Sequence, residues 1–295
     1  MSTSVRSGKP TATALQSCLP AVGDVLVIVG SPRDAASYVG QRLAARAQGS
    51  VTGCTLPPGF FGGVHIAHEP TVMALLSAPA TDVDHRHDMA PGGDGDAFVR
   101  MARTTGARDA RWTAIQADVT NGLRQLATWH DLIVVQKRTV DAPDALDGFD
   151  DLLLGTGIPT LVLPPVCAPS GTFDRVTIGW DGSGAATRAI RCALPLLAAA
   201  HDVLLLDGAP HRPQGTLPAF EPLPFLLRHG IEVTRRRIDA TPSGAGAALL
   251  EKSRRFKADL VVMGAYGHSR LRERVLGGAT RHVLEHAPVA LFLHH

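Results

Sequence analysis

The sequence lacks an excess of either charge, because 29 Lys and Arg residues face 27 Asp and Glu residues, which gives a formal net charge of +2. A balanced charge provides no overall field that would attract nucleic acid or an anionic membrane. The chain also lacks an apolar run long enough to cross a bilayer. We therefore expect neither nucleic acid nor a membrane as a partner.

Cysteine is scarce as well. The chain has four cysteines, and none belongs to a Cys-x-x-Cys pair, which argues against a zinc knuckle and a redox dithiol. Isolated thiols are typical of a reducing compartment, so we expect a cytoplasmic protein. The cysteines are Cys18, Cys54, Cys167 and Cys192.

Familiar catalytic motifs are missing too. The sequence has no Walker Gly-x4-Gly-Lys-[Ser/Thr], no Gly-x-Ser-x-Gly and no His-Glu-x-x-His. The segments 65–69 and 85–88 contain His and acidic residues at spacings that could ligate a metal. They lie in a polar stretch where solvated histidines are the simpler interpretation, so we predict no catalytic residues and no metal site.

The chain repeats itself weakly. At 295 residues it is long enough for two domains of the usual ~100–200 residues. Three apolar segments of the first half resemble three of the second, and the first half carries an insertion that we assign to residues 57–96. The insertion is rich in Pro, Gly, Asp and His, which predicts a long loop with one short helix. The matching segments are 25–30 with 176–181, 131–135 with 259–263, and 158–163 with 287–292.

Strand-like and helix-like segments alternate in the second half. This alternation predicts an α/β fold with two tandem, doubly wound, mostly parallel five-stranded sheets and helices on both faces. We expect a flexible tail over 1–20, a first domain over 21–168 and a second over 172–295. The expected strands of the second domain are 175–180, 202–206, 231–238, 259–263 and 289–293, and the helices are 185–200, 219–229, 243–257 and 279–286.

Glycines gather where the strands of the second half should end. Ligands of parallel α/β sheets bind beyond the carboxyl ends of the strands. Glycine lets the backbone approach an anion closely, and a following helix offers unpaired N–H groups and the positive end of its dipole. Asp181 at a neighbouring strand end could accept hydrogen bonds from a ribose or base. The glycines are Gly182 and Gly184, Gly264 and Gly267, and Gly277 and Gly278.

Simpler interpretations exist for each of these residues. Glycines at strand ends often serve turns. Asp181 could cap the helix that follows it. The basic residues Arg270, Arg272 and Arg274 could form a solvated face rather than contact phosphate.

The combination resembles the universal stress protein family. The pattern Gly264-x2-Gly267-x9-Gly277, between an apolar strand and a helix, is similar to the nucleotide motif of that family, and two such halves resemble its tandem members. The resemblance implies that Asp181 contacts adenosine and that main-chain groups near the strand ends hold the base, ribose and phosphates. The implied nucleotide-binding residues are Asp181, Gly208, Met263, Gly264, Gly267, Gly277, Gly278 and Ala279.

Two departures from the family pattern matter. Gly278 stands where the family usually has Ser or Thr, which removes one phosphate contact worth ~1.5–3 kcal/mol if it is charge-assisted. In the first half, Gly30 replaces the aspartate and the segment 136–138 replaces the glycines. We interpret the first half as a degenerate copy without a nucleotide.

These observations predict a stress- or energy-responsive protein that binds ATP, ADP or AMP in its second half. Mg²⁺ could bind together with the nucleotide. The alternatives are a slow nucleotide hydrolase or transferase, and a structural interaction protein whose site is vestigial. We also expect the two halves to pair through their last strands as a pseudo-dimer within the chain, and homodimers are compatible with this family.

Overall fold

The computed structural model describes residues 22–57, 93–137, 147–167, 170–208, 220–239, 241, 244–266 and 278–295. The expected tail, most of the insertion at 57–96 and its histidines lie outside the described residues. No helix in the described ranges is both long enough and apolar enough to cross a membrane.

The first half alternates strands and helices. Helix α2 begins after Asp34, whose carboxylate accepts a hydrogen bond from the Ser37 N–H, and α4 ends at Gly106 in the left-handed conformation. The elements in chain order are β1 (Asp24–Ile28), α2 (Ala35–Arg46), β2 (Ser50–Thr55), α4 (Asp94–Thr105), β3 (Asp109–Ala114), α5 (Val119–Ala127), β4 (Leu132–Gln136), α6 (Asp147–Thr156) and β5 (Thr160–Leu163).

The second half follows the same plan. Its elements are β6 (Arg175–Trp180), α7 (Gly184–Cys192), α8 (Leu194–Ala199), β7 (Asp202–Asp207), α9 (Pro222–Arg228), β8 (Thr234–Arg237), α10 (Ala245–Phe256), β9 (Leu260–Gly264), α12 (Ala279–His286) and β10 (Ala290–His294).

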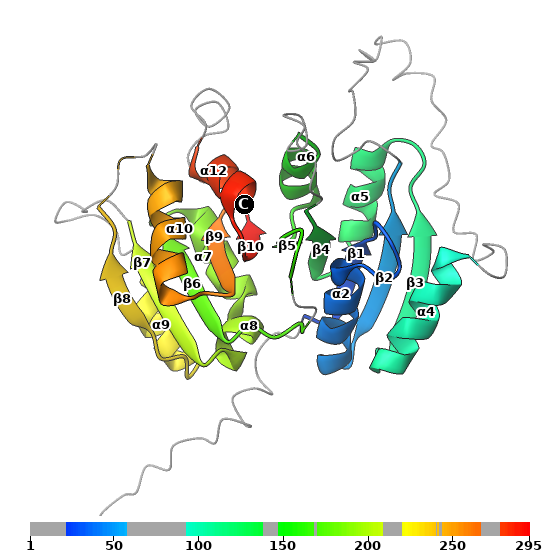
Figure 1. Ribbon diagram of the computed structural model, residues 1–295, viewed down its shortest axis with the longest axis horizontal. Coiled ribbons are helices and arrows are strands. Elements are labelled where there is room, and N and C mark those ends of the chain that lie inside the picture. Colours follow the sequence, from blue (N-terminus) through cyan, green and yellow to red (C-terminus); the bar gives the residue numbers. More distant parts are fainter. Residues whose placement is uncertain are drawn as a thin grey trace, which may run out of the picture.

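One ten-stranded sheet runs across the whole molecule in the order β3-β2-β1-β4-β5-β10-β9-β6-β7-β8 (Figure 1). Within each half the strands are parallel, and the two halves have the same internal order. The α/β fold expected from the sequence is confirmed, and its two five-stranded parallel parts belong to one sheet.

Helices cover both faces of this sheet. Side chains of β1 alternate between two hydrophobic clusters, with Val25 and Val27 on one face and Leu26 and Ile28 on the other. The first cluster includes residues of α2, α4, α7, α8 and α9, whereas the second includes residues of α5, α6, α10 and α12. The near-continuous apolar character of the central strands follows from this burial on both sides.

The two halves meet at the last strand of each. Strands β5 and β10 pair antiparallel, with Leu291 opposite Val162 and Phe292 opposite Leu161, all four of which are buried. Each half therefore covers a sheet edge of the other, which removes two unpaired strand edges from solvent.

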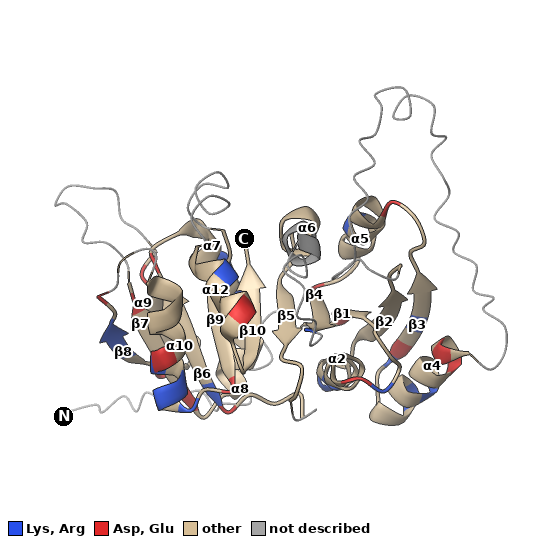
Figure 2. Cartoon of the chain, turned by 45° about the horizontal axis from the view of Figure 1, so that its top comes forward, with Lys and Arg blue, Asp and Glu red and all other residues tan. Residues whose placement is uncertain are grey.

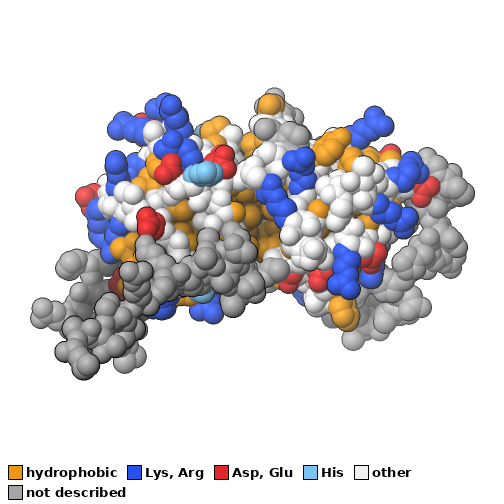
Figure 3. All heavy atoms as spheres, turned by 90° about the horizontal axis from the view of Figure 1, so that it is seen from below, with side chains coloured by type: hydrophobic (Ala, Val, Ile, Leu, Met, Phe, Trp, Pro, Cys, Tyr) orange, Lys and Arg blue, Asp and Glu red, His pale blue; other side chains and the backbone are white. Residues whose placement is uncertain are grey.

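The outer edges of the sheet are β3 and β8. Strand β8 reads Thr-Arg-Arg-Arg and is exposed at every position, and it appears in blue at the end of the sheet in Figure 2. Charged side chains on an edge strand discourage pairing with other chains. In the view from below, basic and acidic side chains are interspersed over the described residues, as expected from the small net charge (Figure 3).

A repeated aspartate explains one of the sequence matches between the halves. The Asp131 carboxylate accepts hydrogen bonds from the Gly23 and Asp24 N–H groups. Asp259 does the same for Asp174 and Arg175. In each half an aspartate just before the fourth strand thus holds the start of the first strand.

Several expected boundaries need correction. The helix predicted over 185–200 is two helices, α7 and α8, because Pro195 has no N–H to continue α7 and lies instead in the first turn of α8. Proline also sets the start of α9 at Pro222 rather than before it. The strand predicted over 231–238 is confined to β8, and residues 231–233 form no regular element.

Candidate functional site

The candidate site lies where three strands of the second half end side by side. Strand β6 lies between β9 and β7 in the sheet, and Asp181 follows its last residue, Trp180. The Gly208 N–H donates to the Trp180 carbonyl at 2.8 Å, which places the end of β7 next to Asp181. Helix α7, which follows β6, and helix α12, which follows β9, pack on opposite faces of the sheet, so the site lies where the doubly wound sheet reverses its winding.

Asp181 shapes the turn into helix α7. Its Oδ1 accepts a hydrogen bond from the Ser183 N–H at 2.9 Å, and Gly182 between them has a φ of 80°. The cap of α7 is Ser183, whose Oγ accepts the Ala186 N–H at 3.1 Å. The alternative in which Asp181 itself caps the helix is therefore wrong, and its carboxylate lies at the strand end.

Gly264 lets strand β9 and helix α7 come into close contact. A methyl group on Gly264 would lie 2.8 Å from Ala185 C and 2.9 Å from Ala186 Cα, and closer still to Ala186 N. The space beside this glycine is therefore filled by the backbone of the first turn of α7. Met263, one residue earlier, is buried and packs in the core.

A buried carboxylate lies on the other side of Asp181. Asp207, the last residue of β7, is 2% exposed and pairs with Arg235, whose Nε donates to Oδ2 at 2.9 Å. The Arg237 Nη1 lies 3.8 Å from Oδ1 of the same carboxylate. The exposed arginines of the edge strand therefore pair with a buried carboxylate at this end of the site, next to Gly208, which is exposed.

Helix α12 begins at the candidate phosphate side of the site. Gly278 is its N-cap with φ −61° and ψ 173°, and no side chain caps this end of the helix. The neighbouring turn after β9 is fixed to the helix, because the Tyr266 N–H donates to the buried Thr280 Oγ1 at 3.2 Å. Ala279 is the first helical residue, and its carbonyl oxygen would lie 2.9 Å from a methyl group on Gly246 of α10.

The remaining predicted positions lie outside the described residues. These are Gly267 and Gly277, together with Arg270, Arg272 and Arg274. The structure thus brings together Asp181, Gly208 and Gly264 at the ends of three strands, with Met263 buried beneath. Among the described residues, no group of three or more His, Cys, Asp or Glu side chains could hold a metal ion.

The equivalent position in the first half is built differently. Asp34 Oδ2 accepts the N–H groups of Gly30 and Ser31, at 2.9 Å and 3.0 Å. The Gln136 Oε1 accepts the Ala35 N–H at 3.1 Å, and its Nε2 donates to Pro165 O at 2.9 Å. Side chains of this half therefore occupy the N–H groups at the end of its first strand and the start of α2.

Sequence reasoning missed three residues of this region, namely Asp207, Arg235 and Thr280. Asp207 ends an apolar strand just as Asp181 follows one, and that similarity could have drawn attention to it. Nothing in the sequence pairs Arg235 with Asp207, because the contact depends on the order of β7 and β8 in the sheet.

Comparison with known proteins gives a family match for the C-terminal part of the chain. Residues 225–293 match the sequence model of the universal stress protein family. This part of the chain is therefore similar to the universal stress protein family. The match covers the end of α9, all of β8, α10, β9 and α12, and most of β10. It therefore includes β9, which ends at Gly264, but not β6 or β7, whose ends adjoin Asp181 and Gly208. No curated protein matches the chain in a sequence search.

Solved structures resemble the whole chain rather than one half. A universal stress protein from Archaeoglobus fulgidus has a TM-score of 0.60 at 15% identity and covers 92% of this chain and 95% of its own. A functionally unknown protein from Pseudomonas aeruginosa has a TM-score of 0.56 at 13% identity, covering 96% and 94%. A candidate universal stress protein from another strain of that species has 0.56 at 14%, covering 95% and 94%. The fold of both halves is therefore shared with proteins of similar length.

Proposed function

We propose that the second half binds one adenine nucleotide, ATP or the related ADP or AMP, and that the protein responds in this way to stress or energy state. The observation that carries the proposal is the meeting of Asp181, Gly208 and Gly264 at three adjacent strand ends, where the winding of the sheet reverses. The match of residues 225–293 to the universal stress protein family model supports it.

The roles proposed for these residues follow from their positions. Asp181 offers a carboxylate at the strand end for the ribose or base hydroxyl and amino groups. Gly208 presents exposed main-chain groups to the base. The N-terminus of α12, at Gly278 and Ala279, supplies N–H groups and the positive end of the helix dipole to phosphates.

The first half should not bind nucleotide. Asp34 and Gln136 already accept hydrogen bonds from the N–H groups of Gly30, Ser31 and Ala35. A nucleotide would have to displace these bonds, and the Asp34 carboxylate would repel phosphate. The pairing of β5 with β10 supports a role for this half as the fixed partner in a pseudo-dimer.

Calorimetric titration of ATP with Mg²⁺ into the full chain tests the proposal. We expect one nucleotide per chain, and Asp181→Ala should weaken binding by ~1–3 kcal/mol, the cost of losing a hydrogen bond to a charged group. The matched control is Asp202→Ala, which removes an exposed aspartate from the opposite end of β7 and should leave affinity unchanged. Gly267→Val should abolish binding.

Gly278→Ser is the complementary test. The backbone of Gly278 has a conformation open to any residue, so serine fits and restores the hydroxyl of the family motif. The affinity of Gly278→Ser for ATP should therefore exceed that of the wild type. Two nucleotides per chain, or unchanged affinity in Asp181→Ala, would place the site elsewhere. No binding by the wild type or by Gly278→Ser would favour a structural role with a vestigial site.

The protein should act as a binder of ATP rather than as an efficient catalyst of ATP hydrolysis. Among the described residues at the strand ends, no water-activating group is evident, so turnover should fall far below the ~1–10³ s⁻¹ of ordinary enzymes. A rate within that range that is lost in Asp181→Ala would indicate the hydrolase alternative.

A further inference from the structure

Helix α12 is held at its two ends by different halves of the molecule. It is a short helix of eight residues, and short helices depend on contacts beyond their own hydrogen bonds. Its N-terminal end packs on Gly246 of α10 and is joined to Tyr266 through Thr280, all within the second half. Its C-terminal end is contacted by Lys137, which follows β4 of the first half.

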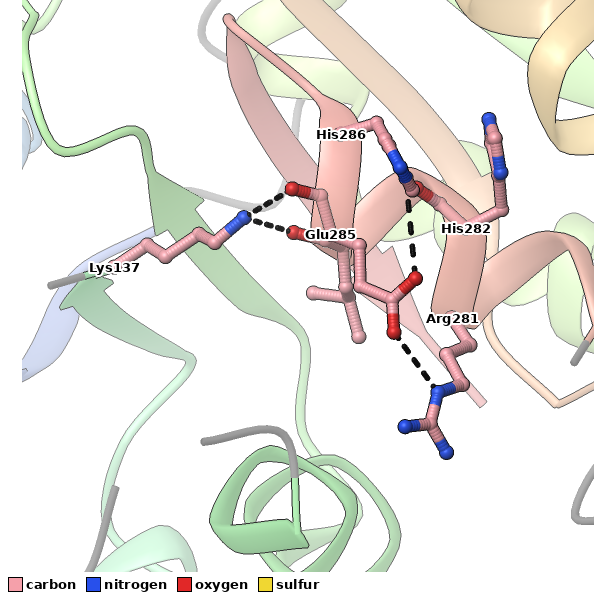
Figure 4. Close-up of polar contacts among 6 residues, drawn as sticks. Lys137, Arg281, His282, Glu285 and His286 are labelled. Carbon is pink, nitrogen blue, oxygen red and sulfur yellow. Dashed lines mark hydrogen bonds and ion pairs between the residues drawn. The ribbon is translucent and has the colours of Figure 1, made fainter. Parts of the chain in front are cut away.

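The contact made by Lys137 is a helix C-cap. The Nζ donates to the carbonyl oxygens of Leu284 and Glu285, each at 2.6 Å (Figure 4). The last carbonyls of a helix have no partner within the helix, and a cation there also interacts favourably with the helix dipole. Burial lowers the pKa of the Lys137 ammonium group, and the Glu285 carboxylate opposes this shift.

The residue of the second half in the equivalent place makes no such contact. Lys137 and Ala265 occupy equivalent places, because each follows the fourth strand of its half and donates its N–H to the last strand, at Leu163 O and His294 O. Alanine has no group that could reach a helix of the other half. The C-terminal part of α6 is contacted by its own half instead, where the Arg124 Nε donates to Gly155 O at 3.3 Å.

We propose that Lys137 is a positioning residue through which the first half holds helix α12, and that it thereby supports nucleotide binding at the opposite end of that helix. The second part of this inference rests on the proposed function. It gives the degenerate first half a defined task, since the lysine stands in the segment that replaced the glycines of the nucleotide motif.

The test compares hydrogen exchange of α12 and ATP affinity in the full chain. Lys137→Met removes the donor while keeping an unbranched side chain, and Lys137→Arg keeps a cation with donors. The matched control is Lys257→Met, which removes an exposed lysine from the end of α10. We expect Lys137→Met to speed exchange in α12 about 5–30-fold, the factor for losing one or two kcal/mol, with α2 unchanged. ATP affinity should fall, Lys137→Arg should restore both properties, and Lys257→Met should change neither.

Each outcome decides the inference. Unchanged exchange of α12 in Lys137→Met would overturn it, as would faster exchange with unaltered ATP affinity. If the wild type binds no ATP, the proposed function fails, and faster exchange confined to α12 would still establish the hold of Lys137 on the helix. If Lys137→Met does not fold, Lys137→Gln provides the neutral comparison, and wild-type exchange in that variant would refute the role of the charge.

Discussion

Gly264→Ala provides a direct test of how strand β9 packs against helix α7. The added methyl group would lie 2.8 Å from Ala185 C and 2.9 Å from Ala186 Cα, which are backbone atoms and cannot rotate away. Overpacking of this kind typically costs ~1–3 kcal/mol. Gly264 is not one of the described glycines with a positive φ, so backbone strain adds nothing to this cost.

Gly208→Ala is the matched control at the end of the neighbouring strand. Within the described part of the chain, its methyl group would meet only Trp180 O, at 3.8 Å, and this glycine has no positive φ either. Both substitutions restrict the unfolded chain equally, which by itself stabilises a protein by about 0.4–1 kcal/mol. The difference between the two variants therefore isolates the collision with α7.

Thermal unfolding of both variants measures that difference. A loss of 1 kcal/mol lowers the melting temperature by about 2–4 °C in chains of 150–250 residues, so Gly264→Ala should melt several degrees below Gly208→Ala. Equal melting temperatures would refute the close packing of β9 on α7. They would instead favour the functional role expected from sequence, in which Gly264 leaves room for a ligand.

Three further predictions concern titration and buried charge. Burial holds the pKa of His130 and His294 below the ordinary 6.5, so the free energy of unfolding measured in urea should fall as the pH is lowered through 6.5. A rise in that free energy as the pH is lowered from 7.5 to 5.5 would contradict this. Burial raises the pKa of Cys54 to about 12, so iodoacetamide at pH 8 should modify Cys54 only after unfolding, and modification of the native chain would refute it. Asp207→Asn should cost ~1–3 kcal/mol of unfolding free energy because Arg235 loses its partner, whereas Arg237→Gln, which removes a half-exposed charge, should cost ~0–1 kcal/mol; equal losses would show that Asp207 is not the centre of this pairing.

The central strands were predictable because they carry apolar runs buried on both faces. The segments 25–28 and 260–263 are apolar at every position, and alternation with helices then implies a parallel sheet. The helix break at Ala193 was less evident, since the surrounding Ala and Leu residues favour helix and only Pro195 opposes it. The start of β8 depended on its pairing with β7, which no local pattern expresses.

The candidate site was predictable in part, for a related reason. Asp181 and Gly264 mark strand ends that are recognisable in the local sequence, but the local sequence does not show which residues lie beside them in the sheet. Gly264 illustrates the limit, because the same glycine suits a close ligand and a close helix, and only the position of Ala186 distinguishes them. The contact from Lys137 to α12 lay further beyond reach, since it joins residues of the two halves.

The difference between the halves comes down to one place in the fold. Gln136 ends β4 as Gly264 ends β9. At Gly264 the absence of a side chain lets α7 approach the strand. Gln136 instead places its amide between the start of α2 and the Pro165 carbonyl, and its oxygen accepts the Ala35 N–H that a ligand would otherwise use. Since Lys137 follows at once and reaches across to α12, the change that closes one site also supplies the residue that supports the helix of the other.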